Sequence, residues 1–365
     1  MRHNTYTAWE IYREEELAAL TPILSSLGIT LEEHQPHIAG ERYLMQAVTT
    51  ASGRKLILLG RTNSHIRVVV KATRDPEGIR ELEHERSCRD FLTKIRFAYE
   101  VFHSPEELHF VRTNGFTISV HRFIEQTSPF IERPLKEQFT LALCAFKAQE
   151  GAHATTHGHT KRIRHIFGTM DADAYLKAFG EFKENILSSG QKELSPLLEK
   201  AQTFLTNGKQ TIEQYTGFLT HTDFVPHNFR VANGNIYLLD HSSLRFGNKY
   251  EGWARFLNFM ALYNPPLEEA LTDYVRLNRA PEELRALQLM RIYRLGEILW
   301  YYTRTLECCE GTLAELNQAR IQFWSRVLAA VLEGKRLPQE EIDAYTTRRD
   351  SLRSDEEKMR QQNLH

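Results

Sequence analysis

The chain has 365 residues and a formal net charge of −1, and 41% of its residues are hydrophobic. This length allows two packed lobes, and the composition is that of an ordinary globular protein. The near-zero charge argues against nucleic acid or an anionic membrane surface as the main partner. No run approaches the ~18 apolar residues of a membrane span.

The cysteines and the N-terminus set the expected compartment. The four cysteines show no metal-type spacing: Cys88, Cys144, Cys308 and Cys309. Residues 1–10 lack the basic and then apolar pattern of a secretory signal. We therefore expect a cytoplasmic protein with reduced cysteines.

The first third of the chain predicts a helix followed by a sheet. Residues 8–27 carry apolar side chains at helical spacing, and Gly28 follows where a C-cap glycine belongs. Five later runs are rich in β-branched or apolar residues and are bounded by turn residues: 42–49, 55–61, 66–72, 108–112 and 116–124. We expect these runs to form an antiparallel sheet, with the helix as an added cap on it.

One lysine and two acids of this region are candidate site residues. Lys71 ends the third run, and a helix is expected from residue 76 to about residue 94. Glu81 and Glu85 lie one turn apart on one face of that helix. Taken alone, they also fit a lysine on an exposed edge strand and a solvated acidic face.

From residue 137 onward the chain is predicted to be mainly helical. The candidate helices are 137–146, 171–187, 194–215, 253–263, 267–278, 281–306 and 312–333. Residues 242–252 are expected to be loop, and the charged end from residue 346 is either a peripheral helix or poorly ordered. His153, His157 and His159 complete no recognised ligand spacing, so a metal site there is not favoured.

Residues 219–240 carry the most chemical information. Asp223 and Asn228 are five residues apart in one loop, and an Asn233-Gly234 turn between apolar runs predicts a hairpin. That hairpin would return Asp240 to Asn228. Carboxylate and amide oxygens suit Mg²⁺ bound together with substrate phosphates, and Asp223 is left to orient a hydroxyl nucleophile. The alternative is an ordinary polar turn with unrelated acids.

The loop resembles the His-Gly-Asp-x-x-Pro-x-Asn loop of the aminoglycoside phosphotransferase and choline kinase family. His221, Asp223, Pro226 and Asn228 match residue by residue, and Asp240 falls where that family has its second metal acid. The resemblance covers about residues 41–335 and is specific only around residues 221–240.

This resemblance implies an α+β, two-lobed protein-kinase-like fold, with a small five-stranded antiparallel sheet lobe and a larger, mostly helical lobe. The implied divisions are a helical cap at 1–40, a nucleotide-binding lobe at 41–125, a catalytic and substrate-binding lobe at 126–340 and a charged tail at 341–365. It also implies transfer of a phosphoryl group from ATP, with Mg²⁺, to a hydroxyl of an aminoglycoside-, choline- or sugar-like small molecule.

Each matching residue takes a role from the resemblance. Asp223 would orient and deprotonate the hydroxyl, while Asn228 and Asp240 would hold Mg²⁺. Two positions depart from the family pattern, because Thr222 replaces the usual glycine and His241 replaces the aromatic residue or glycine that often follows the second acid.

The nucleotide would be held mainly by the sheet lobe. Lys71 would pair with the α- and β-phosphates, braced by Glu85, which fits the family pattern better than Glu81. The other implied nucleotide-binding residues are Ser52 and Gly53 in a phosphate-covering turn and Phe123 and Glu125 at the hinge. That turn has only one glycine, so its role rests on its position in the chain.

The acceptor and the activity leave alternatives open. Trp300-Tyr301-Tyr302 with Glu297 is suited to an alkylammonium group through cation–π attraction, but a helix-core role for these aromatics is favoured. A protein kinase is disfavoured, because His241 follows the second acid instead of Phe-Gly. A catalytically inactive, kinase-like nucleotide-binding or scaffold protein is the main alternative. The sequence does not define the oligomeric state or the choice of ATP over GTP.

Overall fold

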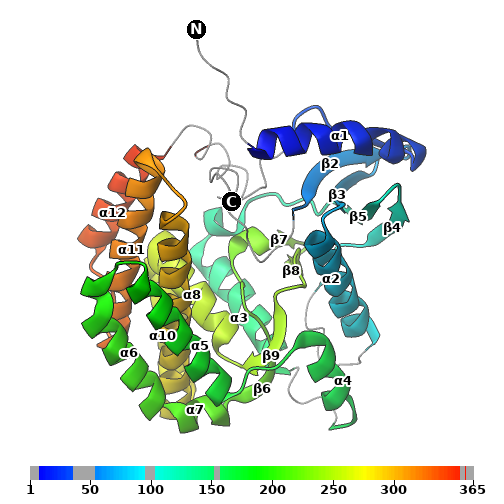
Figure 1. The fold of residues 1–365 in the computed structure, drawn as a ribbon. Coiled ribbons are helices and arrows are strands. Elements are labelled where there is room, and N and C mark those ends of the chain that lie inside the picture. The colour runs from blue at the N-terminus through cyan, green and yellow to red at the C-terminus, as the bar shows by residue number, and fades with distance from the viewer. Residues whose placement is uncertain (1–7, 36–53, 95–102, 152–156, 354–357, 359–365) are drawn as a thin grey trace.

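The computed structural model describes residues 8–35, 54–94, 103–151, 157–353 and 358. It has a small sheet lobe and a larger lobe of mostly helical structure (Figure 1). The predicted α+β, two-lobed architecture with a five-stranded antiparallel sheet is therefore confirmed.

The sheet lobe contains five strands in the order β1-β2-β3-β5-β4 and two helices. Its elements are α1 (Ala8–Ser26), β1 (Ile29–Leu31), β2 (Leu56–Thr62), β3 (Arg67–Thr73), α2 (Pro76–Lys94), β4 (Glu107–Thr113) and β5 (Phe116–Arg122). The strand predicted at 42–49 lies outside the described residues. One of the two edge strands is β1, which was not predicted because three residues are too few to show an alternating pattern.

The two faces of the sheet have different neighbours. Val70 of β3 is buried against α1, where Leu20 and Leu24 complete one hydrophobic cluster with the sheet. Since successive side chains of a strand point to opposite faces, Val69 and Lys71 face the other way, into a cavity between the lobes. Helix α1 was expected to be an added cap on the sheet. It is instead part of the hydrophobic core of the sheet lobe.

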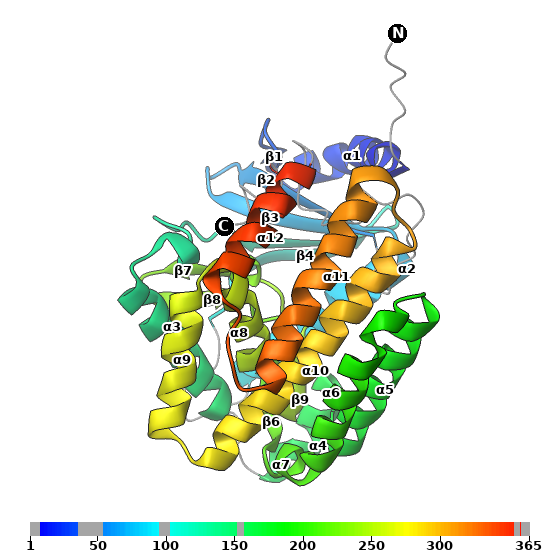
Figure 2. The same cartoon turned by 90° about the vertical axis from the view of Figure 1, so that its left-hand side faces the viewer.

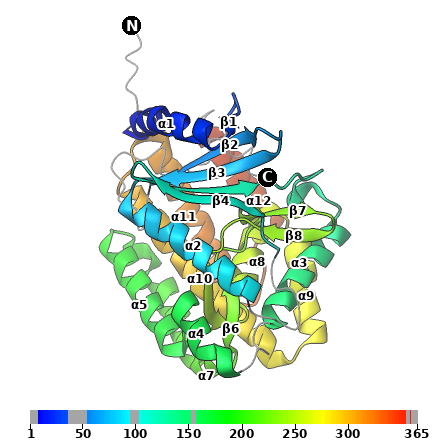
Figure 3. The same ribbon diagram turned by 90° about the vertical axis from the view of Figure 1, so that its right-hand side faces the viewer.

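Helix α2 crosses the sheet lobe and reaches the helical lobe (Figure 3). Its Glu85, Cys88 and Phe91 are buried. The ring of Phe91 packs edge-on against Phe167, with 5.8 Å between the ring centroids. The helix that carries Glu85 is thus held from both lobes.

The helical lobe is built around α10, which packs against α5, α8 and α11 (Figure 2). Its helices are α3 (Leu135–Gly151), α4 (His157–Phe167), α5 (Ala172–Ser188), α6 (Ser195–Asn207), α7 (Lys209–Gln214), α8 (Glu251–Tyr263), α9 (Pro265–Asn278), α10 (Pro281–Leu306), α11 (Gly311–Leu332) and α12 (Gln339–Leu352). None of the helices in the described part of the chain has the length and apolar character needed to cross a membrane.

Two small two-stranded sheets belong to the larger lobe. Strand β6 (Thr216–His221) pairs with β9 (Leu244–Asn248), and β7 (Phe229–Ala232) pairs with β8 (Asn235–Leu238). The predicted hairpin is therefore present. Strand β9 corrects the expected loop at 242–252, since its short alternation beside Gly247 was not identified as a strand.

The helical part of the prediction needs correction at several points. The helix expected at 194–215 breaks at Gly208, where a Cβ would collide with Leu289 of α10. The residue pair at 265–266 starts α9, and the Asn264 side chain caps that helix by accepting from the Leu267 N–H at 3.3 Å. Residues 339–352 form a helix, so residues 346–352 of the charged end are helical, as one of the two alternatives expected.

Candidate active site

A cavity of about 600 Å³ lies between the sheet lobe and the β7–β8 hairpin. Its wall in the sheet lobe is apolar where Ile57 and Val69 project from β2 and β3, and Leu238 of β8 faces them from the other lobe. Lys71 and Asp240 lie at the same cavity. This arrangement offers apolar surface for a flat ring and charges for a polyanion.

Lys71 forms the expected ion pair with Glu85. Its Nζ donates to the two carboxylate oxygens of Glu85 at 2.6 and 2.8 Å and to the Leu239 carbonyl oxygen at 2.9 Å. Glu81 instead pairs with Lys55 at 2.9 Å. The choice between the two acids is therefore settled by geometry in favour of Glu85.

The loop after β6 is fixed from beneath by buried apolar side chains. Phe224 and Val225 are buried, and a short 3-10 helix spans Pro226–Asn228. The Asn228 Nδ2 group donates to the backbone oxygen of Asp223 at 2.8 Å and to its Oδ2 at 2.7 Å. Because the amide nitrogen is committed in this way, the amide oxygen of Asn228 is the atom left for a cation.

Thr222, which stands where the resembling loop has glycine, makes two hydrogen bonds to a neighbouring segment. Its N–H donates to the Ser243 carbonyl at 2.8 Å, and its hydroxyl donates to the same oxygen at 3.0 Å. Thr222 therefore connects the loop that carries Asp223 and Asn228 to the segment that follows Asp240.

The hairpin returns Asp240 to Asn228 as predicted. Asn233 and Gly234 both have positive φ, at 52° and 74°, as a two-residue hairpin turn requires. The Leu239 N–H donates to the Asn228 carbonyl at 2.9 Å, which places the next residue, Asp240, beside the loop.

The Asp240 carboxylate is held in its ionised form. Its Oδ1 accepts from the N–H and the hydroxyl of Ser242 at 2.8 and 2.6 Å. Burial opposes ionisation, but the Lys71 charge and the Ser242 hydrogen bond hold the pKa of Asp240 below its ordinary value. An ionised carboxylate beside an uncommitted amide oxygen fits the donor set that Mg²⁺ prefers.

Three buried histidines surround this carboxylate and its cavity. Burial lowers the pKa of His221, and its Nε2–H donates to the Asp240 carbonyl at 2.7 Å. Burial lowers the pKa of His241 to about 3, and its ring meets the Ser104 hydroxyl at 2.8 Å. His241, one of the two positions that depart from the family pattern, thus connects this segment to the sheet lobe through its hydrogen bond with Ser104. Burial and the charge of Arg89 lower the pKa of His121 to about 2.

Arg255 is a candidate site residue that sequence reasoning missed. It lies on α8, and its Nε–H donates to Asp223 Oδ1 at 2.8 Å. Burial opposes ionisation of Asp223, but the charges of Arg255 and Arg294 lower its pKa. No local pattern links residues 223 and 255, so only the packing of α8 against the loop reveals the contact.

The predicted hinge residues have different surroundings. Phe123 lines the cavity, and the Cζ atoms of Arg67 and Arg230 lie 4.1 and 5.5 Å from the centroid of its ring. The Glu125 side chain is 71% exposed and lies 3.4 Å from the Arg67 guanidinium, and Glu125 is not among the residues that line the cavity. The predicted Ser52 and Gly53 lie outside the described residues.

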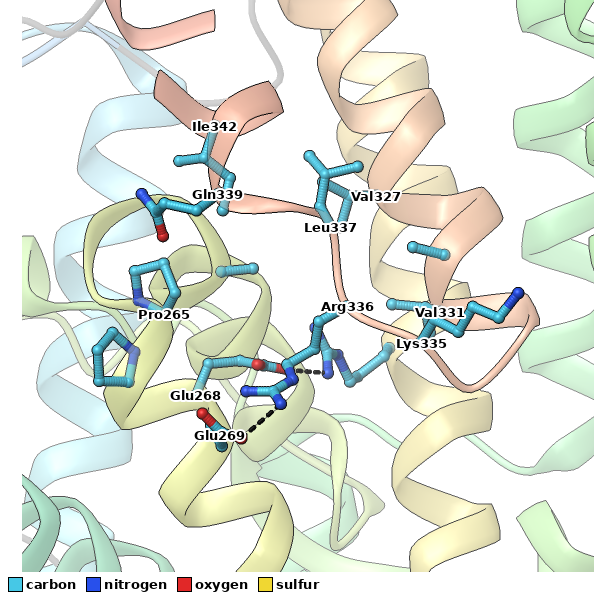
Figure 4. A pocket seen from close by; sticks show the side chains of 14 residues that line it. Pro265, Glu268, Glu269, Val327, Val331, Lys335, Arg336, Leu337, Gln339 and Ile342 are labelled. Atoms are coloured by element: carbon cyan, nitrogen blue, oxygen red, sulfur yellow. Dashed lines mark hydrogen bonds and ion pairs between the residues drawn. The ribbon is translucent and has the colours of Figure 1, made fainter. Parts of the chain in front are cut away.

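Other candidate regions give no second site. Trp300 stacks on Phe182 at 5.3 Å, in agreement with the helix-core interpretation. A smaller cavity of about 310 Å³ lies on the helical lobe near Arg336, which pairs with Glu269, and contains none of the predicted site residues (Figure 4). Within the described ranges, no group of three or more His, Cys, Asp or Glu side chains is placed to hold a metal.

The two lobes, the Asp-x4-Asn loop and the hairpin acid at their junction define a protein-kinase-like fold. Among solved structures, the fold is that of the aminoglycoside and macrolide phosphotransferases. A macrolide 2'-phosphotransferase type I is 12% identical with a TM-score of 0.57, covering 84% of this chain and 97% of that chain.

Two further structures give the same result. Aminoglycoside phosphotransferase APH(4)-Ia, as a thermostable mutant with AMP-PNP and hygromycin B, is 15% identical with a TM-score of 0.54, over 77% of this chain and 93% of that chain. Macrolide 2'-phosphotransferase MphH from Brachybacterium faecium is 14% identical with a TM-score of 0.52, over 89% of this chain and 100% of that chain. No family model and no curated protein matches the sequence.

Proposed function

We propose that this chain is an ATP-dependent phosphotransferase that moves a phosphoryl group to a hydroxyl of a small molecule, of the aminoglycoside, choline or sugar kind. The observation that carries this proposal is the convergence of Lys71, Asp223, Asn228 and Asp240 on one junction between lobes. Lys71 comes from a strand that lies far in the sequence from the loop and hairpin that carry the other three residues.

The site chemistry supports phosphoryl transfer, in which catalysis is mainly positioning and charge stabilisation. Asp223 is ionised at neutral pH and partly exposed, so it can accept the hydrogen of an acceptor hydroxyl. Lys71 supplies a cation for the phosphates. Mg²⁺, when bound, supplies charge neutralisation on those phosphates, and the Asn228 amide oxygen and the Asp240 carboxylate are the groups that would hold it.

The solved neighbours support a nucleotide donor and a small acceptor. One of them was solved with AMP-PNP and hygromycin B. The alternative of an inactive binding protein has less support, because the four charged or amide side chains that the reaction needs are all present and aimed at one junction.

The proposal is tested by an ATP-consumption screen of the purified protein against aminoglycosides, macrolides, choline, amino alcohols and sugars. Once an acceptor is found, Asp223→Ala is expected to reduce turnover by ~10²–10⁴-fold, since a positioned base contributes about that much. Nucleotide binding and the unfolding midpoint are expected to stay close to wild type. Nucleotide binding with no turnover across the panel would favour the inactive alternative.

A further inference from the structure

The carboxylate of Asp223 is held at both oxygens by groups from two different elements. Asn228 donates to Oδ2 at 2.7 Å from the same loop, and Arg255 donates to Oδ1 at 2.8 Å from α8. The terminal torsion of an aspartate is soft, with a broad range of allowed values. Two donors on opposite oxygens remove that freedom, and each oxygen keeps one lone pair for a further hydrogen bond.

Arg255 is itself carried on a fixed element. Helix α8 is joined to β6 by the Gly252 N–H, which donates to the Thr220 hydroxyl at 3.0 Å. Four residues before Arg255, the buried Glu251 pairs with Arg245 and lies 3.5 Å from Arg294. The start of α8 is therefore tied to the strand that leads into the loop.

The ion pair is of little use as a stabilising device. The side chains of Arg255 and Asp223 are 20% and 41% exposed, and pairs that water reaches contribute little to stability. Among the interactions of the described residues, Arg255 has Asp223 as its ion-pair partner, while the nearby Arg245 and Arg294 are held by Glu251.

We infer that Arg255 is a positioning residue for the proposed phosphoryl transfer: it fixes the Asp223 carboxylate so that a free lone pair faces the acceptor hydroxyl. This inference rests on the proposed function and adds a residue to it. Misplacing a reacting group by about 1 Å can cost ~10²-fold in rate. The role predicts an effect on kcat with little effect on the KM for ATP, since Arg255 does not line the nucleotide cavity.

The kinetic test compares Arg255→Gln, Arg255→Lys and a matched control. Arg279→Gln is that control, because Arg279 is also 20% exposed and pairs with Glu150 at 3.0 Å outside the site. We expect Arg255→Gln to lose on the order of 10–10²-fold in kcat, Arg255→Lys to recover part of it, and Arg279→Gln to stay at the wild-type value. Unchanged kcat in Arg255→Gln overturns the inference. A raised KM for ATP with an unchanged kcat in Arg255→Gln also overturns the inference.

A second measurement needs no acceptor. In proton–nitrogen spectra of the arginine Nε–H groups, the Arg255 signal is identified by its loss in Arg255→Lys, and it is expected to move in Asp223→Ala. A signal that does not move shows that the pair is absent in solution and overturns the inference. A wild-type chain that transfers no phosphoryl group contradicts the proposed function, whereas an active chain that is insensitive to Arg255 contradicts this role alone.

Discussion

Lys71 and Glu85 form a nearly buried ion pair, with side chains 12% and 5% exposed. Removing one partner of such a pair leaves an uncompensated buried charge, which is more harmful than losing the pair as a whole. Single substitutions here therefore disturb the site even though the pair adds little net stability. The same reasoning applies to Asp240, whose ionised state depends on Lys71.

We predict that Lys71 and Glu85 act as one unit in turnover. Lys71→Met and Glu85→Gln should each reduce kcat/KM, and the double variant should be little worse than Lys71→Met alone, because Glu85 acts only by aiming the ammonium group. The measurement is a double-mutant cycle with the acceptor found in the screen. Losses that multiply in the double variant would show that the two residues act independently.

We predict that Asp240→Asn weakens nucleotide binding mainly when Mg²⁺ is present. The substitution removes the one carboxylate of the candidate cation site while keeping the side-chain shape. Loss of a ligand charge is expected to cost roughly tenfold or more in Mg²⁺-dependent affinity. Nucleotide titrations with Mg²⁺ and with EDTA measure the difference. Equal weakening in both conditions would assign Asp240 to structure instead of to metal binding.

At the scale of elements, the site depends on one tight hairpin. Strands β7 and β8 are four residues each, and their two-residue turn sets the position of Asp240. Gly234 has a φ of 74°, and a Cβ at this residue would meet no atom within 4 Å. Glycine is therefore favoured at this position because of its positive φ, and not because a Cβ would collide with neighbouring atoms.

We predict that Gly234→Ala and Gly190→Ala separate stability from activity. Gly190 also has a positive φ, 92°, with no atom within 4 Å of a Cβ, but it lies between α5 and α6, away from the site. Both variants should lose about 1 kcal/mol of unfolding free energy through backbone strain. Only Gly234→Ala should also reduce turnover. Urea unfolding and initial rates measure the two effects, and equal activity in both variants would contradict the role of the turn.

The sequence predicted those parts of the site that lie close together along the chain. Asp223, Asn228 and Asp240 fall within one loop and one hairpin, so their spacing carries the geometry. Arg255 was missed because its contact depends on how α8 packs on β6, which no local pattern records. The strands β1 and β9 were missed because three to five residues beside glycine or asparagine give too short an alternation.

At the scale of the whole molecule, two hydrophobic clusters meet at a polar junction. One cluster joins α1 to the sheet, and the other runs from α2 through the helical lobe. The junction between them holds buried histidines that stay neutral, because burial lowers the pKa of His121 to about 2 and that of His241 to about 3.

We predict that the protein loses stability below pH 6.5. In this range His121 becomes protonated in the unfolded chain but stays neutral in the folded protein. A histidine with a depressed folded pKa contributes stability that is complete above the unfolded pKa of about 6.5 and is lost as pH falls toward the folded value. His121 alone should cost on the order of 1 kcal/mol per pH unit below 6.5. Urea unfolding at several pH values measures this slope. His121→Gln should flatten it, and an unchanged slope would show that His121 does not remain neutral.

The third hydrogen bond of Lys71 has a consequence for how the lobes move. An ammonium group has three protons, and here two go to Glu85 and one to the Leu239 carbonyl of the opposite lobe. A phosphate oxygen that binds Lys71 must therefore take the place of one of these acceptors. If the Leu239 carbonyl is the acceptor that is released, nucleotide binding at Lys71 breaks this hydrogen bond between the two lobes. The lobes would then be free to close again around the nucleotide itself.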